Sequence, residues 1–144
     1  MTQTTDSPHI LLSIQPIYAE KIFKGLKTVE LRKSFPKMSE GQSVIIYVST
    51  PVKAIVGGFN VSKIVTAPPD EIWKIAGDQA CVSRDFFDEY YADANTGHAI
   101  FIGDVWKYES SLTLDSLRII IHNFTPPQNF RYLCKSLTES FASV

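Results

Sequence analysis

The alternation of apolar and polar residues in the first third of the chain predicts a strand, a helix and a second strand in close succession. An apolar run at 10–14 is followed by Pro16, whose fixed φ suits the first turn of a helix. Apolar residues then recur on one helical face, namely Tyr18, Ala19, Ile22 and Phe23. Gly25 ends this helix because glycine tolerates left-handed φ. In residues 27–32, apolar and polar side chains alternate, which predicts a strand with one charged face.

The rest of the chain also predicts a mixture of strands and helices. Residues 43–49 are nearly all apolar and predict a central strand, and residues 53–66 predict another, bent at the Gly57-Gly58 pair. Short helices are expected after Pro68 and after Ser83. The later predicted elements are a strand at 98–105, a helical turn at 113–117, a strand at 118–124 and a helix at 129–142. The pattern predicts an α+β fold with about five or six strands, and bent strands favour a small β-barrel with flanking helices.

The organisation along the chain is that of one unit. The 144 residues carry no internal repeat and no linker-like stretch, so we expect a flexible N-terminal tail at 1–8 and a single domain at 9–144. The longest apolar run, 44–48, is far below the roughly 20 residues that cross a bilayer. The first residues also lack a secretory signal. We therefore expect a cytoplasmic protein that does not enter a membrane.

Charge, cysteine content and motifs exclude several functions. Fourteen basic and fifteen acidic residues give a net charge of −1, which argues against coating of duplex DNA by bulk electrostatics. Cys81 and Cys134 have no CxxC spacing, so we expect two reduced thiols and no zinc. The chain has no HExxH motif and no phosphate-binding glycine loop. We expect neither a metal nor a cofactor such as ATP or NAD.

Candidate chemistry lies between the first and third predicted strands. Glu30 and Arg32 are two positions apart on one strand face, about 6.6–6.8 Å, so their long side chains can form an ion pair. The alternative is a solvated face with a weak surface pair. Tyr47 lies in an otherwise aliphatic strand, where its ring packs in the core or offers a stacking face for a base. Ser13 and Ser49 end strands, where serine forms turns or donates to a ligand.

Five sequence segments taken together closely resemble the ASCH family. They are Ser13-Ile14-Gln15-Pro16, Tyr18-Ala19-Glu20-Lys21-Ile22, Gly25-x-Lys27-x-x-Glu30-x-Arg32, the segment 46–57, and Pro126-Pro127-Gln128-x-Phe130-Arg131-Tyr132-Leu133. The resemblance covers residues 9–133. It implies a compact β-barrel related to the PUA fold, with helices flanking a cleft. The implied ligand is RNA or a modified nucleobase or nucleoside.

The resemblance also implies roles for Lys27 and Glu30. Some small family members are amidohydrolases that remove an acyl group from N4-acetylated cytidine, and Lys27 matches the lysine that they use. Glu30 stands where those members have a threonine nucleophile. A glutamate there can instead act as general base on water or accept hydrogen bonds from the amino edge of a base. These two residues are therefore the catalytic candidates if the protein is an enzyme.

The remaining candidates are ligand-binding residues. They are Ser13, Arg32, Tyr47, Ser49, Gln128 and Arg131. Arg32 orients Glu30 or contacts phosphate, because its planar fork suits either partner. Gln128 and Arg131 contact a base edge and a phosphate, or cap a helix at the surface. The aromatic stripe of residues 86, 87, 90 and 91 has helical spacing, which favours a place in the core.

Three classes of function stay open at this stage. The first is a module that binds RNA or a nucleoside in a charged cleft beside the first helix. The second is an enzyme on the same cleft, either an amidohydrolase acting on N4-acylated cytidine compounds, with Lys27 as base, or a ribonuclease. The third is a non-catalytic regulator linked to transcription or translation. The resemblance fits all three because function is not fixed by a fold.

Overall fold

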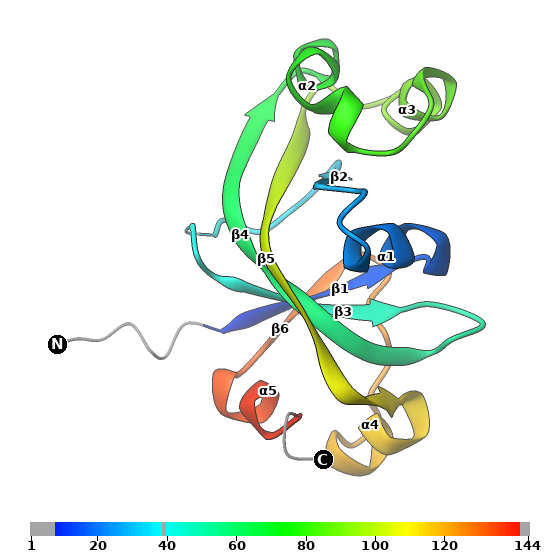
Figure 1. The fold of residues 1–144 in the computed structure, drawn as a ribbon, viewed down its shortest axis with the longest axis vertical. Coiled ribbons are helices and arrows are strands. Elements are labelled where there is room, and N and C mark those ends of the chain that lie inside the picture. Colours follow the sequence, from blue (N-terminus) through cyan, green and yellow to red (C-terminus); the bar gives the residue numbers. More distant parts are fainter. Residues whose placement is uncertain (1–7, 39, 142–144) are drawn as a thin grey trace, which may run out of the picture.

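The computed structural model describes residues 8–38 and 40–141, arranged around a six-stranded mixed sheet (Figure 1). The elements in chain order are β1 (His9–Ile14), α1 (Pro16–Phe23), β2 (Val29–Arg32), β3 (Ser43–Val48), β4 (Ala54–Ala67), α2 (Pro69–Ala76), a short 3-10 helix η1 (Gly77–Gln79), α3 (Arg84–Tyr90), β5 (Gly97–Thr113), α4 (Leu114–Ile120), β6 (Phe130–Leu133) and α5 (Lys135–Phe141). The expected tail lies outside the described residues except for Pro8. No helix of the described part is long and apolar enough to cross a membrane.

The strand order across the sheet is β2-β5-β4-β3-β1-β6. β1 and β3 are parallel, and every other neighbouring pair is antiparallel. β4 and β5 are much longer than the other strands and form a bent ribbon along the molecule (Figure 1). This ribbon carries α2 and α3 at one end and α4 at the other (Figure 1). The two groups of helices therefore lie at opposite ends of the sheet.

The α+β class and the strand number are confirmed, but closure into a barrel is not found. Among the described residues, no pairing joins the edge strands β2 and β6. The predicted bend is present, because the register between β4 and β5 shifts between Ile55 and Gly57. Glycine is required there, since a Cβ at Gly57 would lie 2.1 Å from the carbonyl oxygen of Trp106. The sheet is thus bent by close backbone approach without a demonstrated closed barrel.

Two predicted elements near the C-terminus are wrong. The strand predicted at 118–124 is instead the end of α4, which continues to Ile120, followed by a turn. The Thr113 hydroxyl caps α4 by accepting from the backbone N–H of Ser116 at 3.1 Å, and Leu117 anchors it in the core. The helix predicted at 129–142 begins only at Lys135. Residues 130–133 form β6 because they pair with β1 at the edge of the sheet.

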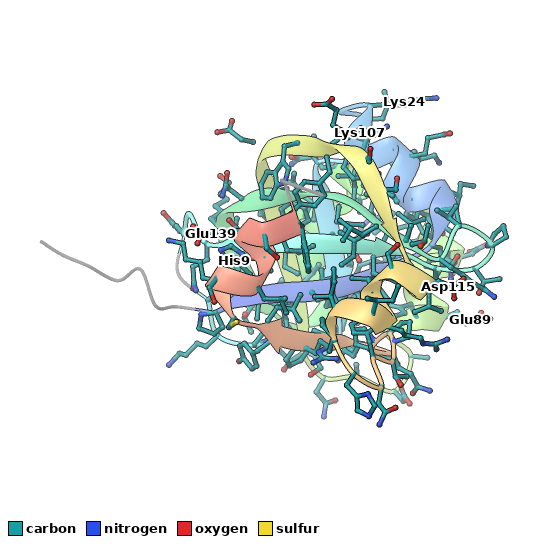
Figure 2. All side chains as sticks on the ribbon, turned by 90° about the horizontal axis from the view of Figure 1, so that it is seen from below. His9, Lys24, Glu89, Lys107, Asp115 and Glu139 are labelled. Atoms are coloured by element: carbon teal, nitrogen blue, oxygen red, sulfur yellow. The ribbon has the colours of Figure 1, made fainter. Side chains whose placement is uncertain are left out.

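Both faces of the sheet are covered by apolar side chains. Alternate residues of β1 point to opposite faces, so Leu12 packs with α1 whereas Leu11 packs with α4 and α5. A third cluster lies under α2 and α3 and includes Phe87 and Tyr91. Figure 2 shows α4 and α5 over their face of the sheet, with His9 beside α5. Packing on both faces fixes β1 and β3, whose C-terminal ends carry the candidate site.

Candidate functional site

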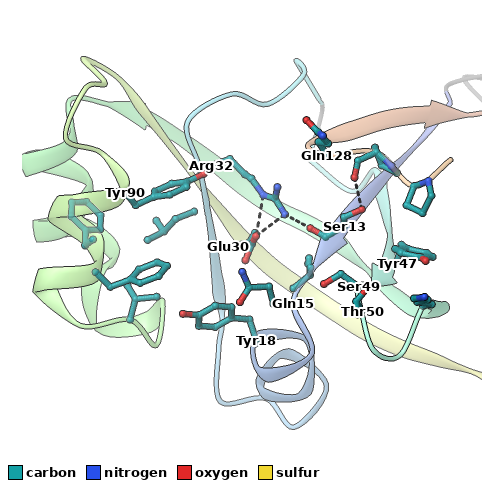
Figure 3. A pocket seen from close by; sticks show the side chains of 18 of the residues that line it. Ser13, Gln15, Tyr18, Glu30, Arg32, Tyr47, Ser49, Thr50, Tyr90 and Gln128 are labelled. Atoms are coloured by element: carbon teal, nitrogen blue, oxygen red, sulfur yellow. Dashed lines mark hydrogen bonds and ion pairs between the residues drawn. The ribbon is translucent and has the colours of Figure 1, made fainter.

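A pocket of about 530 Å³ opens beside the C-terminal ends of β1 and β3 (Figure 3). Because these two strands are parallel, their C-terminal ends meet at the same edge of the sheet, and Ser13 is directly paired with Tyr47. Helices α1 and α3, strand β2 and the segment 126–128 complete the walls. Residues far apart in the sequence are therefore brought to one hollow.

The walls of the pocket differ in chemistry from one end to the other. Side chains from α1 and α3 form an aromatic wall, which consists of Tyr18, Phe86, Phe87 and Tyr90. The opposite end is polar and is lined by Ser13, Ser49, Thr50, Lys53 and Gln128. Figure 3 shows Glu30 and Arg32 between these two ends. The pocket thus offers flat apolar surface, hydrogen-bonding groups and charge to a single ligand.

A buried ion pair separates the two ends of the pocket. Arg32 Nε and Nη2 each lie 3.0 Å from Glu30 Oε2, and Nη2 also donates to the carbonyl of Ser13 at 2.9 Å. The two side chains are only 11% and 10% exposed. The alternative of a solvated strand face is therefore wrong, because the backbone of β1 and the covering helices enclose the pair.

Lys27 lies behind Glu30 and does not line the pocket. Its side chain is 3% exposed, its ammonium donates to the carbonyl of Ala80, and Nζ stands 3.7 Å from Glu30 Oε1. Burial lowers the pKa of Lys27, and the attraction of Glu30 opposes that shift. The ring of Tyr18 lies 5.3 Å from the same ammonium. Lys27 thus links the segment just before β2 to Ala80, just after η1, and supplies a second cation beside the carboxylate.

Ser13 and Tyr47 are held in place by groups around the pocket. Ser13 Oγ donates to the carbonyl of Pro127 at 2.6 Å, which ties the segment 126–128 to β1. Tyr47 packs against Phe124, with ring centroids 6.4 Å apart, and is 3% exposed. Its ring serves the core and also lines the pocket. Burial raises the pKa of its phenol.

Six of the eight sequence-predicted candidates line this pocket. They are Ser13, Glu30, Arg32, Tyr47, Ser49 and Gln128. The two others do not: Lys27 is buried behind Glu30, and the guanidinium of Arg131 lies 5.2 Å from the ring of Phe124. The structure therefore brings most of the candidates together, while their roles stay predictions.

Some lining residues were not singled out from the sequence. Lys53, with a positive φ of 52°, follows the cis Thr50-Pro51 bond and brings a cation to the polar end. Its place within the segment 46–57 that resembles the ASCH family was the available signal. The aromatic stripe of α3 serves both the core and the pocket: Phe86 and Tyr90 line the pocket, Tyr91 is in the core, and Phe87 does both. Tyr90 is fixed there because its hydroxyl accepts from the backbone N–H of Lys33 at 3.2 Å.

The described residues show no donor set for a metal. No group of three or more His, Cys, Asp and Glu side chains in 8–38 and 40–141 has an arrangement that could hold an ion. Cys81 and Cys134 are both free, as expected.

Comparisons with known proteins agree with this architecture. The family described as a domain of unknown function (DUF365) matches residues 10–121. An ASCH domain-containing ribonuclease of Zymomonas mobilis is 29% identical over 144 residues, which are 100% of this chain and 97% of that protein. The crystal structure of ASCH from Zymomonas mobilis superposes with a TM-score of 0.88 at 29% identity, covering 94% of both chains. The chain belongs to the ASCH domain family.

These matches confirm the resemblance to the ASCH family that the sequence shows. A further relative is the large ribosomal subunit protein uL22 of Ureaplasma parvum, 29% identical over 133 residues. Those residues are 91% of this chain and only 40% of that protein. The same sequence pattern therefore occurs within a longer chain.

Proposed function

We propose that this ASCH domain binds RNA and takes one unpaired nucleotide into the pocket. The observation that carries the proposal is the meeting of an aromatic wall, a buried Glu30–Arg32 pair and Lys53 in one hollow. A volume of about 530 Å³ lies within the range of about 300–1,000 Å³ that small-ligand sites occupy. Such a pocket admits a base only when the base leaves its stack, so single-stranded RNA is the expected partner.

Each part of the pocket suits one part of a nucleotide. Aromatic rings such as Tyr18 and Tyr90 offer flat faces for a base, and stacking is worth about 1–3 kcal/mol per base. Lys53, Ser49 and Thr50 supply a cation and two hydroxyls at the polar end, which suit a phosphate or a ribose. Two cations beside the single carboxylate of Glu30 make the interior favourable to an anionic ligand.

RNA cleavage is the second candidate function. It is supported by the Zymomonas mobilis relative, a ribonuclease that matches this chain over its full length. Glu30 is the pocket's carboxylate and Lys53 a cation at its other end, so these two are the candidates for proton transfer and charge stabilisation. Hydrolysis of N4-acylated cytidine has weaker support. Its expected base, Lys27, does not line the pocket and donates to Ala80 instead.

Fluorescence anisotropy with a labelled single-stranded RNA tests the proposal. We expect the single strand to bind more tightly than the matching duplex, and Lys53→Met to weaken binding by about three- to tenfold. Lys63→Met is the matched control, since Lys63 is also an exposed lysine but lies over Phe101, outside the pocket. Absence of binding by the unmodified protein, or an equal loss in both variants, would contradict the proposal.

The same RNA incubated with the protein and separated on a denaturing gel tests cleavage. Products that accumulate with the unmodified protein and disappear in Glu30→Gln would support the ribonuclease. RNA that stays intact across metal-free and metal-containing buffers would exclude that second candidate. It would leave the binding proposal standing.

A further inference from the structure

We propose that the pocket selects a base with an exocyclic amino group, cytosine or adenine, and that Glu30 recognises that group. The inference rests on the proposed function, because it assumes that a nucleotide enters the pocket. It goes beyond that function by naming the class of base and the atom that distinguishes it. The argument begins with the two oxygens of the Glu30 carboxylate.

The two oxygens of Glu30 have different surroundings. Oε2 takes both contacts from Arg32, from Nε and from Nη2, at 3.0 Å. The cation that pairs with Oε1 is Lys27, whose Nζ lies 3.7 Å away, which is longer than the 2.7–3.2 Å of an N–H···O hydrogen bond. The Lys27 ammonium makes its short contact with the carbonyl of Ala80 instead. Oε1 therefore keeps acceptor capacity in a side chain that is only 10% exposed and lines the pocket.

An ionised carboxylate accepts hydrogen bonds and cannot donate them. Oε1 therefore favours the N–H of an amino group, such as N4 of cytosine or N6 of adenine. Uracil and hypoxanthine present a carbonyl oxygen at the corresponding position, which would face Oε1 lone pair to lone pair. A buried polar group left without a partner disfavours the wrong ligand more strongly than a contact in water would. The geometry thus distinguishes amino bases from carbonyl bases.

The aromatic wall leaves a place for the ring of that base. Figure 3 shows Glu30 with Tyr18 and Tyr90 on one side and the polar residues Ser13 and Ser49 on the other. Phe86, in the same wall, is 46% exposed although it is a large apolar side chain. A base stacked on this wall would cover the exposed ring and bring its edge toward Glu30. The ribose and phosphate would then extend to the polar end.

Two matched pairs of mononucleotides test the inference by calorimetry or NMR titration. CMP and UMP differ at the amino or carbonyl position of a pyrimidine, and AMP and IMP differ in the same way in a purine. We expect the amino member of a pair to bind about tenfold more tightly. In Glu30→Gln, the donors of Arg32 hold the amide oxygen, so the amide NH₂ faces the ligand. The preference should then disappear or reverse toward UMP and IMP.

The outcomes separate this inference from the proposed function. Equal binding of both members of each pair would overturn the inference and leave nucleotide binding intact. Binding of none of the four nucleotides would overturn both. A Glu30→Gln variant that weakens all four equally would show that Glu30 only supports the structure. Glu20→Gln is the control, because Glu20 is 68% exposed and pairs with Lys24 outside the pocket, and it should keep the amino preference.

Discussion

Replacing Arg32 with methionine tests the claim that the charged pair is a buried and fixed part of the pocket wall. Methionine keeps much of the apolar stem but removes the guanidinium. Glu30 then loses the two contacts at 3.0 Å, and the carbonyl of Ser13 loses the contact at 2.9 Å. Because the two side chains are only 11% and 10% exposed, water replaces these contacts poorly.

The expected magnitude follows from this geometry. Removing one partner of a buried pair costs about 3–5 kcal/mol because the other charge is left uncompensated. Lys27 remains 3.7 Å from the carboxylate and compensates in part, so we expect a value near the lower end, about 3 kcal/mol. Arg32→Lys keeps the charge, but one ammonium cannot replace the fork toward both Glu30 and Ser13. The Arg32→Lys variant should therefore lose about half as much free energy of unfolding as Arg32→Met.

Urea unfolding followed by circular dichroism gives the free energy of unfolding of each variant. Arg84→Met is the matched control, because Arg84 also pairs with two carboxylates, Asp70 and Asp88, but on the surface. An exposed pair of this kind contributes at most about 1 kcal/mol. The reasoning is refuted if Arg32→Met loses no more stability than Arg84→Met. It is also refuted if Arg32→Lys is as damaging as Arg32→Met.

Two further predictions concern the frame around the pocket. Burial lowers the pKa of His9 below 6.5, so its contribution to stability is present above pH 6.5 and is lost as the pH falls through the lowered value. Urea unfolding at about pH 7 and about pH 5 should therefore show an acid loss that is smaller in His9→Gln, and equal losses in both proteins would speak against this. Gly57→Ala should cost about 3 kcal/mol because its Cβ would meet the backbone of β5, whereas Gly103→Ala, with its nearest contact at 3.0 Å, should cost less by the same unfolding assay. An alanine at position 57 that is tolerated as well as one at 103 would mean that β4 and β5 do not approach so closely.

The first half of the fold was predictable because its signals are local. The apolar run at 10–14, Pro16 and Gly25 define β1 and α1 without help from distant residues. The C-terminal part was mispredicted because β6 is set by a partner at the other end of the chain, where Leu12 pairs with Phe130. Nothing in the local pattern of 129–142 distinguishes such an edge strand from the start of a helix.

In the candidate site, too, local signals were predictable from the sequence and contacts between distant residues were not. Two-residue spacing on a strand was enough to expect the Glu30–Arg32 pair. Its burial was not predictable, since it depends on the carbonyl of Ser13 and on the helices that cover β2. The position of Lys27 behind the carboxylate depends on Ala80, a contact between segments far apart in the sequence. Spacing thus predicts which side chains share a face, and tertiary contacts decide which of them a ligand can reach.

The most direct test of the central claim is a titration of isotopically labelled protein with single-stranded RNA, followed by amide chemical shifts. The account predicts that the largest shifts occur at residues around the pocket, among them Ser13, Ser49, Lys53 and Gln128. Shifts that are absent there, or that gather around Arg118 in α4 and Asn123 just after that helix, would contradict it.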